Sequence, residues 1–344
     1  MSRKRVLSVE AYVDGVRSGD RATLARAMTL MESSHPDHRA LAEEVLTRLL
    51  PFTGKAYRLG ISGAPGVGKS TFVERFGLDL VAAGRRVAVL AVDPSSAVSG
   101  GSVLGDKTRM TRLSQEPNAF IRPTPSGTKL GGVSSHTREM LLVAEAAGYD
   151  VVMVETVGVG QSELAAAAMV DFFLVLMAPA GGDDLQGIKR GILELADAIA
   201  VNKADGDLIA RARQAQAGYA AALKILAPRD RGWTPQALSV SALSGLGLPE
   251  LWALIEEQRR TLVEAGIFEE RRKEQLRSWM WSLVEDELWG AFRRDPEVQA
   301  KLQETEAAVT SARMTPSAAA RALVGPFIGE DPGTGSASPA SKGS

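Results

Sequence analysis

Residues 63–70 have the sequence Gly-Ala-Pro-Gly-Val-Gly-Lys-Ser, which fits the phosphate-binding loop pattern of a glycine, any four residues and then Gly-Lys-Ser or Gly-Lys-Thr. The run 57–62 before it reads as a short buried strand, and the run 69–83 after it reads as an amphipathic helix. In the order strand, glycine loop, helix, backbone N–H groups and a helix N-terminus converge on a phosphate. The flanks therefore favour a nucleotide-binding loop over the alternative, a glycine-rich turn.

Two side chains of this loop have expected roles. Lys69 would reach the β- and γ-phosphates and help to neutralise their charge, and the Ser70 hydroxyl would bind Mg²⁺. The glycines allow positive φ and a close approach of the backbone to the phosphates. The expected nucleotide-binding residues here are Gly63, Ala64, Pro65, Gly66, Val67, Gly68, Lys69, Ser70 and Thr71.

A second motif, Asn202-Lys203-Ala204-Asp205, follows the apolar run 198–201 and indicates which base is bound. The Asp205 carboxylate can accept hydrogen bonds from guanine N1–H and the 2-amino group, whereas adenine would leave it unpaired. We expect Asn202 at the purine N7/O6 edge and the stem of Lys203 along the base. The motif therefore predicts GTP and GDP, rather than ATP, as ligands.

A third motif, Ser241-Ala242-Leu243, follows the apolar run 237–240. The backbone N–H of Ala242 could donate to guanine O6. Alone this motif is weak, but it agrees with the second one because both follow predicted strands.

Between residues 57 and 247, apolar runs alternate with helical segments. The predicted strands are 57–62, 86–92, 119–122, 150–155, 172–177, 198–201 and 237–240, and predicted helices include 134–147 and 210–226. Such alternation is typical of a mainly parallel sheet covered by helices on both faces. Ligands of these sheets bind outside the carboxyl ends of the strands, where all three motifs fall. The expected fold class is an α/β P-loop NTPase, with a helical N-terminal extension and a C-terminal helical arm.

We expect the chain to have four parts. These are a helical N-terminal extension over 1–52, a G domain over 53–248, a C-terminal helical arm over 249–328 and a disordered tail, rich in Gly, Ser and Pro, over 329–344. A predicted helix of the arm, about 268–292, holds three of the five tryptophans, Trp279, Trp281 and Trp289. They either pack onto the G domain or form a dimerisation surface, since large aromatic residues are enriched at interfaces.

Acidic residues near the ends of predicted strands are candidates for a metal shell. Asp93 follows one strand, Glu155 ends another where GTPases usually carry an aspartate, and Asp106 lies in a glycine-rich segment. Together with Ser70, these residues are expected to hold Mg²⁺ directly or through water. The expected catalytic residues are Lys69, Asp106 and Glu155, because phosphoryl transfer depends on positioning and charge stabilisation.

Two further segments have the composition of switches. The glycine-rich segment 99–110 suits a loop that becomes ordered on γ-phosphate and Mg²⁺. The loop 179–189 has two glycines beside two aspartates, and it would lie at the same rim of the sheet. In that loop Asp183, Gln186 and Lys189 would sense the nucleotide or a partner.

The composition excludes several classes of protein. The 344 residues carry a net charge of −1, which argues against a nucleic-acid or anionic membrane partner. The chain holds 0 cysteines, which excludes disulfides, thiol catalysis and thiolate metal sites. An apolar run of about 18 residues is absent from the sequence, so we expect no membrane span, and an untargeted cytoplasmic protein is the preferred interpretation.

Taken together, the motifs resemble the methylmalonyl-CoA mutase-associated G proteins, the MeaB/ArgK/MMAA type. The resemblance covers about residues 8–325. Besides the phosphate loop and the Asn-Lys-Ala-Asp motif, it rests on Val-Asp-Pro-Ser-Ser at 92–96, Ser-Gly-Gly-Ser-Val-Leu-Gly-Asp-Lys-Thr-Arg-Met at 99–110, Val-Glu-Thr-Val-Gly-Val-Gly-Gln-Ser-Glu at 154–163 and Leu-Gln-Gly-Ile-Lys at 185–189.

The resemblance implies a GTPase that is a chaperone of the adenosylcobalamin-dependent methylmalonyl-CoA mutase, gates loading of its cofactor and protects it from inactivation. It also implies a homodimer formed through the C-terminal arm, activation of the GTPase by the mutase, and a third switch at 179–189. One alternative is a chaperone of a different acyl-CoA mutase. Another is a metal-delivering GTPase, which should carry Cys and His ligands, whereas this chain has 0 cysteines and only His35, His38 and His136.

Overall fold

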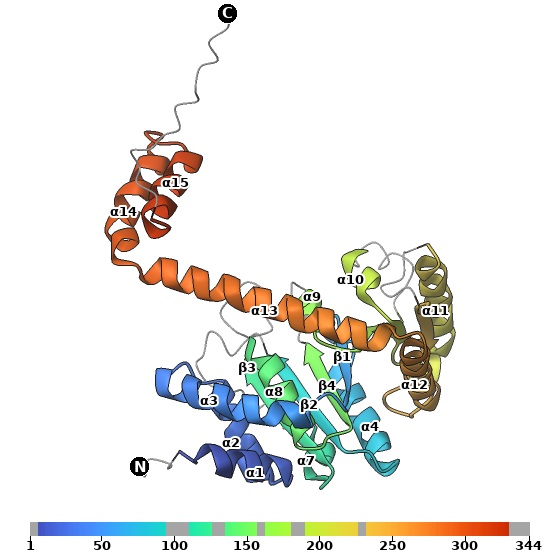
Figure 1. Cartoon of the computed structure of the whole chain (residues 1–344). Coiled ribbons are helices and arrows are strands. Elements are labelled where there is room, and N and C mark those ends of the chain that lie inside the picture. Colours follow the sequence, from blue (N-terminus) through green and yellow to red (C-terminus); the bar gives the residue numbers. More distant parts are fainter. Residues whose placement is uncertain are drawn as a thin grey trace, which may run out of the picture. The chain divides into compact units, whose positions relative to one another are not determined.

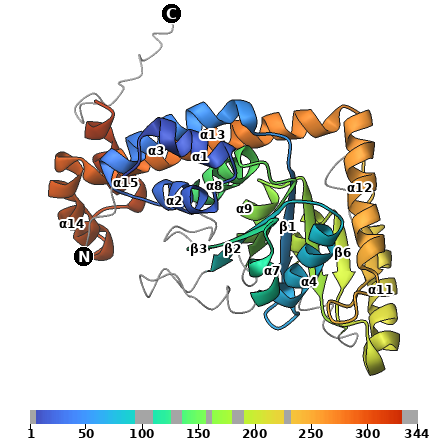
Figure 2. The same cartoon turned by 90° about the horizontal axis from the view of Figure 1, so that it is seen from below.

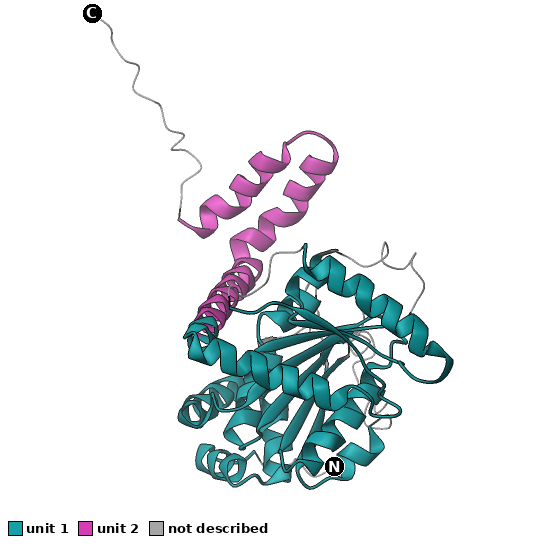
Figure 3. Cartoon of the chain, turned by 90° about the vertical axis from the view of Figure 1, so that its right-hand side faces the viewer, with its two compact units in different colours: residues 1–272 teal, residues 273–344 magenta. Residues whose placement is uncertain are grey.

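The structure is a computed structural model, and it describes residues 6–93, 110–125, 135–156, 162–179, 190–225 and 232–329. Contacts divide the chain into two compact units, Met1–Arg272 and Lys273–Ser344, which Figure 3 draws in different colours. Apart from Gly329, the tail predicted to be disordered lies outside the described residues.

Unit 1 is built around a seven-stranded sheet in which every neighbouring pair of strands is parallel. The strands are β1 (Tyr57–Gly63), β2 (Val87–Asp93), β3 (Ala119–Pro125), β4 (Val151–Thr156), β5 (Phe172–Met177), β6 (Ala198–Val201) and β7 (Gln236–Ser239). Their order in the sheet is β3-β2-β4-β1-β5-β6-β7, of which Figure 1 labels β1, β2, β3 and β4. The predicted α/β fold is confirmed, and the phosphate loop leaves from β1, between β4 and β5.

The described helices of unit 1 precede, connect or follow the strands. They are α1 (Val9–Arg17), α2 (Arg21–Met31), α3 (Pro36–Leu49), η1 (Leu50–Phe52), α4 (Lys69–Ala82), α7 (Thr111–Gln115), α8 (Ser135–Ala146), α9 (Ser162–Ala167), α10 (Arg190–Leu195), η2 (Gly206–Leu208), α11 (Ile209–Leu223) and α12 (Leu248–Glu264). The long helix α13 (Ile267–Arg294) begins in unit 1 and continues into unit 2.

The sheet separates two hydrophobic cores, because successive strand residues point to opposite faces. In β2, Val87 and Val89 belong to the core that contains α4, α7 and α12. Ala88 and Leu90 belong to the core that contains α8 and α11. Figure 2 shows α4 and α8 on opposite sides of the strands. Since both faces are covered, the strands read as continuous apolar runs rather than as alternating ones.

Helices α1 and α2 each begin directly after a capping residue. The side chain of Ser8 accepts a hydrogen bond from Ala11 N at 3.2 Å, and that of Asp20 accepts one from Thr23 N at 2.7 Å. Both satisfy backbone donors that a helix start would leave unpaired. Helices α2 and α3 then pack against α8, so the N-terminal extension forms an outer layer over that face of the sheet.

Unit 2 contains the rest of α13 together with α14 (Pro296–Thr310) and α15 (Pro316–Phe327), which pack on each other. The ring of Phe292 lies edge-on to Trp289 at 5.8 Å and to Phe327 at 5.4 Å between centroids. In the described part of the chain, every helix is too short or too polar to cross a membrane.

Candidate nucleotide-binding site

The phosphate loop needs glycine at two positions that the structure identifies. Gly63 has φ 151°, and a Cβ there would lie 2.4 Å from the carbonyl oxygen of Leu176 on β5. Gly68 has φ 94°, and a Cβ there would lie 2.9 Å from Asn202 Nδ2. Both backbone conformations are unfavourable for a residue with a side chain. The loop is therefore held between β5 on one side and the Asn202 loop on the other.

Lys69, the first residue of α4, lies inside the phosphate loop. Its Nζ donates to the carbonyl oxygens of Gly63 at 2.7 Å and Ala64 at 3.2 Å, and the residue is 8% exposed. Burial lowers the pKa of the Lys69 ammonium from its ordinary value, although the carboxylates of Glu155 and Glu163 act in the opposite direction. A phosphate in the loop would supply the negative charge that favours this buried cation.

Ser70 and Glu155 meet where the metal is expected. The Ser70 hydroxyl donates to Glu155 Oε1 at 3.0 Å, and Glu155 is buried near the carboxyl end of β4. Both provide the hard oxygen atoms that Mg²⁺ takes as ligands, and a nucleotide-bound Mg²⁺ needs few protein ligands besides phosphate and water. These residues therefore fit Mg²⁺. The side chain of Asp93 and the whole of Asp106 lie outside the described residues.

Asn202 connects the three motifs. Its Nδ2 donates to Val67 O in the phosphate loop at 2.9 Å, and its Oδ1 accepts from Ala242 N at 3.1 Å. Neither contact could be predicted from the sequence, because each partner is distant along the chain. The Ala242 N–H that we expected at guanine O6 is thus engaged by Asn202. The predicted contacts of both residues with the purine remain predictions.

Replacing Asn202 with alanine should destabilise the site as a whole. The change leaves Val67 O and Ala242 N without their buried partner, so we expect a loss of about 2–3 kcal/mol in the free energy of unfolding. Urea denaturation followed by circular dichroism measures this loss. Asn118→Ala, at an exposed position, is the matched control. Equal stability of the two variants would contradict the bridging role.

Lys203 crosses from the base loop to the phosphate loop. Its backbone has φ 61°, uncommon for a residue with a side chain, and its Nζ donates to Gly66 O at 2.8 Å. This places the stem of Lys203 alongside the phosphate loop, at the rim where a base would lie. The position of the stem along the base stays a prediction.

Asp205 is oriented by the third motif. The buried Ser241 hydroxyl donates to Asp205 Oδ2 and accepts from Ser244 N at 3.0 Å. A carboxylate fixed in this way can present its other oxygen atom and remaining lone pairs to two donors of a base. Leu243, by contrast, is 77% exposed at the tip of its turn. Ser241 can orient Asp205 because the two residues lie close together in the fold. They are 36 residues apart in the sequence, so this contact could not be predicted from their spacing.

Four predicted site residues lie outside the described part. They are Asp183, Gln186 and Lys189 of the loop 179–189, in addition to Asp106. Within the described residues, no group of three or more His, Cys, Asp or Glu side chains is placed to hold a metal. His35 and His38 lie at the start of α3, where His35 is exposed and His38 is half-buried.

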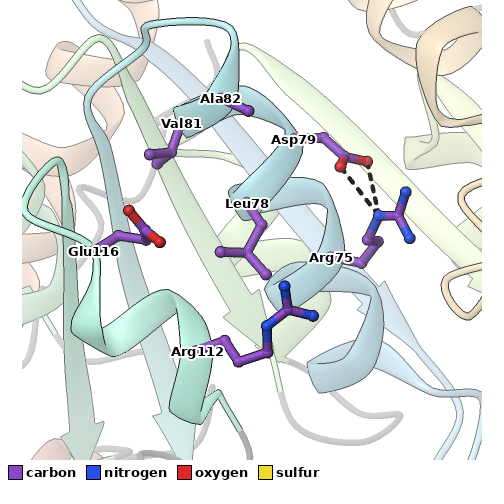
Figure 4. Close-up of a pocket in the computed structure, with 7 residues that line it drawn as sticks. All are labelled: Arg75, Leu78, Asp79, Val81, Ala82, Arg112 and Glu116. Carbon is purple, nitrogen blue, oxygen red and sulfur yellow. Dashed lines mark hydrogen bonds and ion pairs between the residues drawn. The ribbon is translucent and has the colours of Figure 1, made fainter.

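A separate hollow of about 460 Å³ lies between α4 and α7. Figure 4 shows its lining residues, which are Arg75, Leu78, Asp79, Val81, Ala82, Arg112 and Glu116. Arg75 Nε donates to both carboxylate oxygens of Asp79, at 3.0 and 3.1 Å. Two arginines and two carboxylates balance each other in charge. The lining therefore does not select a ligand by charge, and it includes none of the predicted nucleotide-binding residues.

Comparisons with known proteins agree on one family. A family model described as "Methylmalonyl Co-A mutase-associated GTPase MeaB" matches residues 24–297. A putative GTPase from Caulobacter vibrioides is 52% identical over 93% of this chain and 98% of its own length. The mitochondrial methylmalonic aciduria type A homolog of Mus musculus is 45% identical over 95% of this chain and 81% of its own length. Among solved structures, a LAO/AO transport system kinase superposes with a TM-score of 0.77 at 39% identity, over 95% of this chain and 100% of that chain.

Proposed function

The chain belongs to the MeaB family of methylmalonyl-CoA mutase-associated GTPases and is a GTP hydrolase, and we propose that it serves an adenosylcobalamin-dependent methylmalonyl-CoA mutase as a chaperone. In this role it gates loading of the cofactor onto the mutase and protects the mutase from inactivation. The description of the family and the name of the mouse relative support this choice of client.

One observation carries the proposal of a guanine-nucleotide site. Asn202 Nδ2 contacts the phosphate loop, Asn202 Oδ1 contacts Ala242, and Ser241 orients Asp205. Phosphate-binding and base-reading residues are thus joined in one hydrogen-bonded unit at the carboxyl ends of the strands. A nucleotide that fills both parts must carry phosphates at one end and a base with two adjacent donors at the other.

In the proposed reaction the chain contributes position and charge rather than covalent chemistry. Lys69 places its ammonium beside the β- and γ-phosphates, where it offsets their negative charge. Ser70 and Glu155 would hold Mg²⁺ through their oxygen atoms, which already lie 3.0 Å apart. When bound, Mg²⁺ supplies further neutralisation of charge on the phosphate oxygens. Asp93 and Asp106 remain proposed members of the same shell.

The proposal includes a homodimer formed through the C-terminal helices. Five large apolar side chains of α13 are half or more exposed, and they are Leu276, Met280, Trp281, Leu288 and Trp289. Exposed aromatic and aliphatic residues gathered on one helix are typical of an interface. Their exposure supports a second copy of the chain as the partner of this surface.

The client is tested by GTP turnover with and without an adenosylcobalamin-dependent methylmalonyl-CoA mutase. We expect the mutase to raise kcat for GTP by about tenfold or more, since accessory proteins of GTPases complete the catalytic arrangement. ATP should not be hydrolysed at a comparable rate. Phosphate release measured at saturating nucleotide gives both results.

A second mutase that acts on another acyl-CoA serves as the control. Stimulation by that enzyme alone would identify a different client and contradict the assignment to methylmalonyl-CoA mutase. Slow GTP hydrolysis that neither mutase changes would contradict the chaperone role, while leaving the GTPase activity in place.

A further inference from the structure

Two neighbouring strands of the sheet are each preceded by a buried aspartate. Asp171 precedes β5, and its Oδ2 accepts from Arg58 N on β1 at 2.8 Å. Asp197 precedes β6, and its Oδ2 accepts from Phe173 N on β5 at 2.7 Å. Both lie at the amino edge of the sheet, opposite the nucleotide site. They are buried charges that the proposed reaction does not use.

Each of these aspartates faces an arginine from the first turns of α13. Arg272 Nη2 lies 2.6 Å from Asp171 Oδ2, and Arg271 Nη2 lies 3.7 Å from Asp197 Oδ2. Arg271 also donates to Val170 O at 3.1 Å. Consecutive residues of one helix thus bind the residues that directly precede two consecutive strands. Both ion pairs are buried. Removing one charge of a pair would therefore leave the opposite charge buried without its partner, which is strongly destabilising.

Asp197, which precedes β6, also contacts β5 and the segment before β7. Its backbone N–H donates to Phe173 O at 2.9 Å, which with the carboxylate contact fixes it against β5 from two sides. Its carbonyl oxygen accepts from the indole Nε1 of Trp233 at 2.9 Å. Trp233 is buried and lies three residues before β7. Asp197 therefore anchors the start of β6 and the approach to β7 together.

The far ends of these two strands carry the base-reading loops. β6 has four residues and ends immediately before Asn202, and β7 ends two residues before Ser241. A strand rises about 3.3 Å per residue and is held by its ladder, so a shift at one end is transmitted to the other. A change at Asp197 would thus move Asp205 and Ser241 relative to the phosphate loop, which follows β1.

We propose that Asp197, held by Arg271, is a positioning residue for guanine recognition. It sets the position of β6 and β7, and through them the alignment of the Asp205 carboxylate with the base. This inference rests on the proposed guanine site. The first turns of α13, which supply Arg271, would thereby influence which base is bound.

The test compares GTP with inosine triphosphate, which lacks the 2-amino group and so makes one hydrogen bond fewer to Asp205. For Arg271→Gln and Asp197→Ala we expect the ratio of kcat/KM for GTP to that for inosine triphosphate to fall about three- to tenfold. KM for GTP should rise while kcat changes little. Arg271→Lys, which keeps the charge, should restore most of the ratio. A general loss of folded protein would lower both rates equally and leave the ratio unchanged.

Asp150→Asn is the control, because Asp150 precedes β4 and its Oδ2 accepts from Arg86 N before β2 at 2.7 Å, and neither strand carries the phosphate loop or a base-reading loop at its far end. Its ratio should equal that of the unaltered protein. An unchanged ratio in folded Arg271→Gln would overturn the proposal, as would an equal fall in Asp150→Asn. If Asp197→Ala does not fold, Asp197→Asn and Arg271→Gln decide the question. Failure of the guanine assignment itself would be distinguishable, because the unaltered protein would then show no preference for GTP.

Discussion

Lys69→Ala is expected to lower kcat/KM for GTP by about 10³-fold, a change that steady-state phosphate release measures directly. The ammonium of Lys69 is buried in the phosphate loop, where its Nζ lies 2.7 Å from Gly63 O. Removing it takes away a fixed positive charge from a site with little water, where such charges have their largest effect. Both binding of the phosphates and stabilisation of charge in the transition state should suffer.

Lys55→Ala removes the same charge from an exposed position outside the loop, and it should leave turnover unchanged. Circular dichroism of Lys69→Ala checks that the protein remains folded. A folded Lys69→Ala protein that hydrolysed GTP at the normal rate would refute the assignment of residues 63–70 as the catalytic phosphate loop.

The parts of the fold that follow local rules could be predicted from the sequence. The continuous apolar runs of β2 and β5 predict strands because both faces of a parallel sheet are covered. The phosphate loop is predictable because its glycines and Lys69 lie within eight residues of one another. The C-terminal end of β3 is predicted less accurately, since the strand extends to Pro125, beyond the predicted end at residue 122.

The parts that depend on pairing across the chain could not be predicted. Asn202 illustrates this, because its two partners, Val67 and Ala242, lie 135 and 40 residues away in the sequence. Asp197 reads as a polar residue before an apolar strand, yet it anchors three segments. Such functions arise from strand order, and strand order is set by packing rather than by the pattern of any single strand.

Asp205→Asn is expected to exchange the preferred base. The asparagine amide would present an N–H donor where the carboxylate presented an acceptor, so it opposes the 2-amino group of guanine but matches the 2-oxo group of xanthine. We expect kcat/KM for GTP to fall by about 10²- to 10³-fold, and that for xanthosine triphosphate to rise above it. Turnover of both nucleotides under the same conditions gives the comparison.

The structure indicates that this exchange leaves the pocket intact. The Ser241 hydroxyl, which donates to Asp205 Oδ2, can donate to an amide oxygen or accept from an amide nitrogen, so it can hold an asparagine in either orientation. Asp207→Asn, two residues further on and exposed, is the control and should keep the preference for GTP. If Asp205→Asn also kept that preference, Asp205 could not be the residue that reads the base. The hydrogen-bonded unit of Asn202, Ala242 and Ser241 would then hold the phosphate loop in place without selecting guanine.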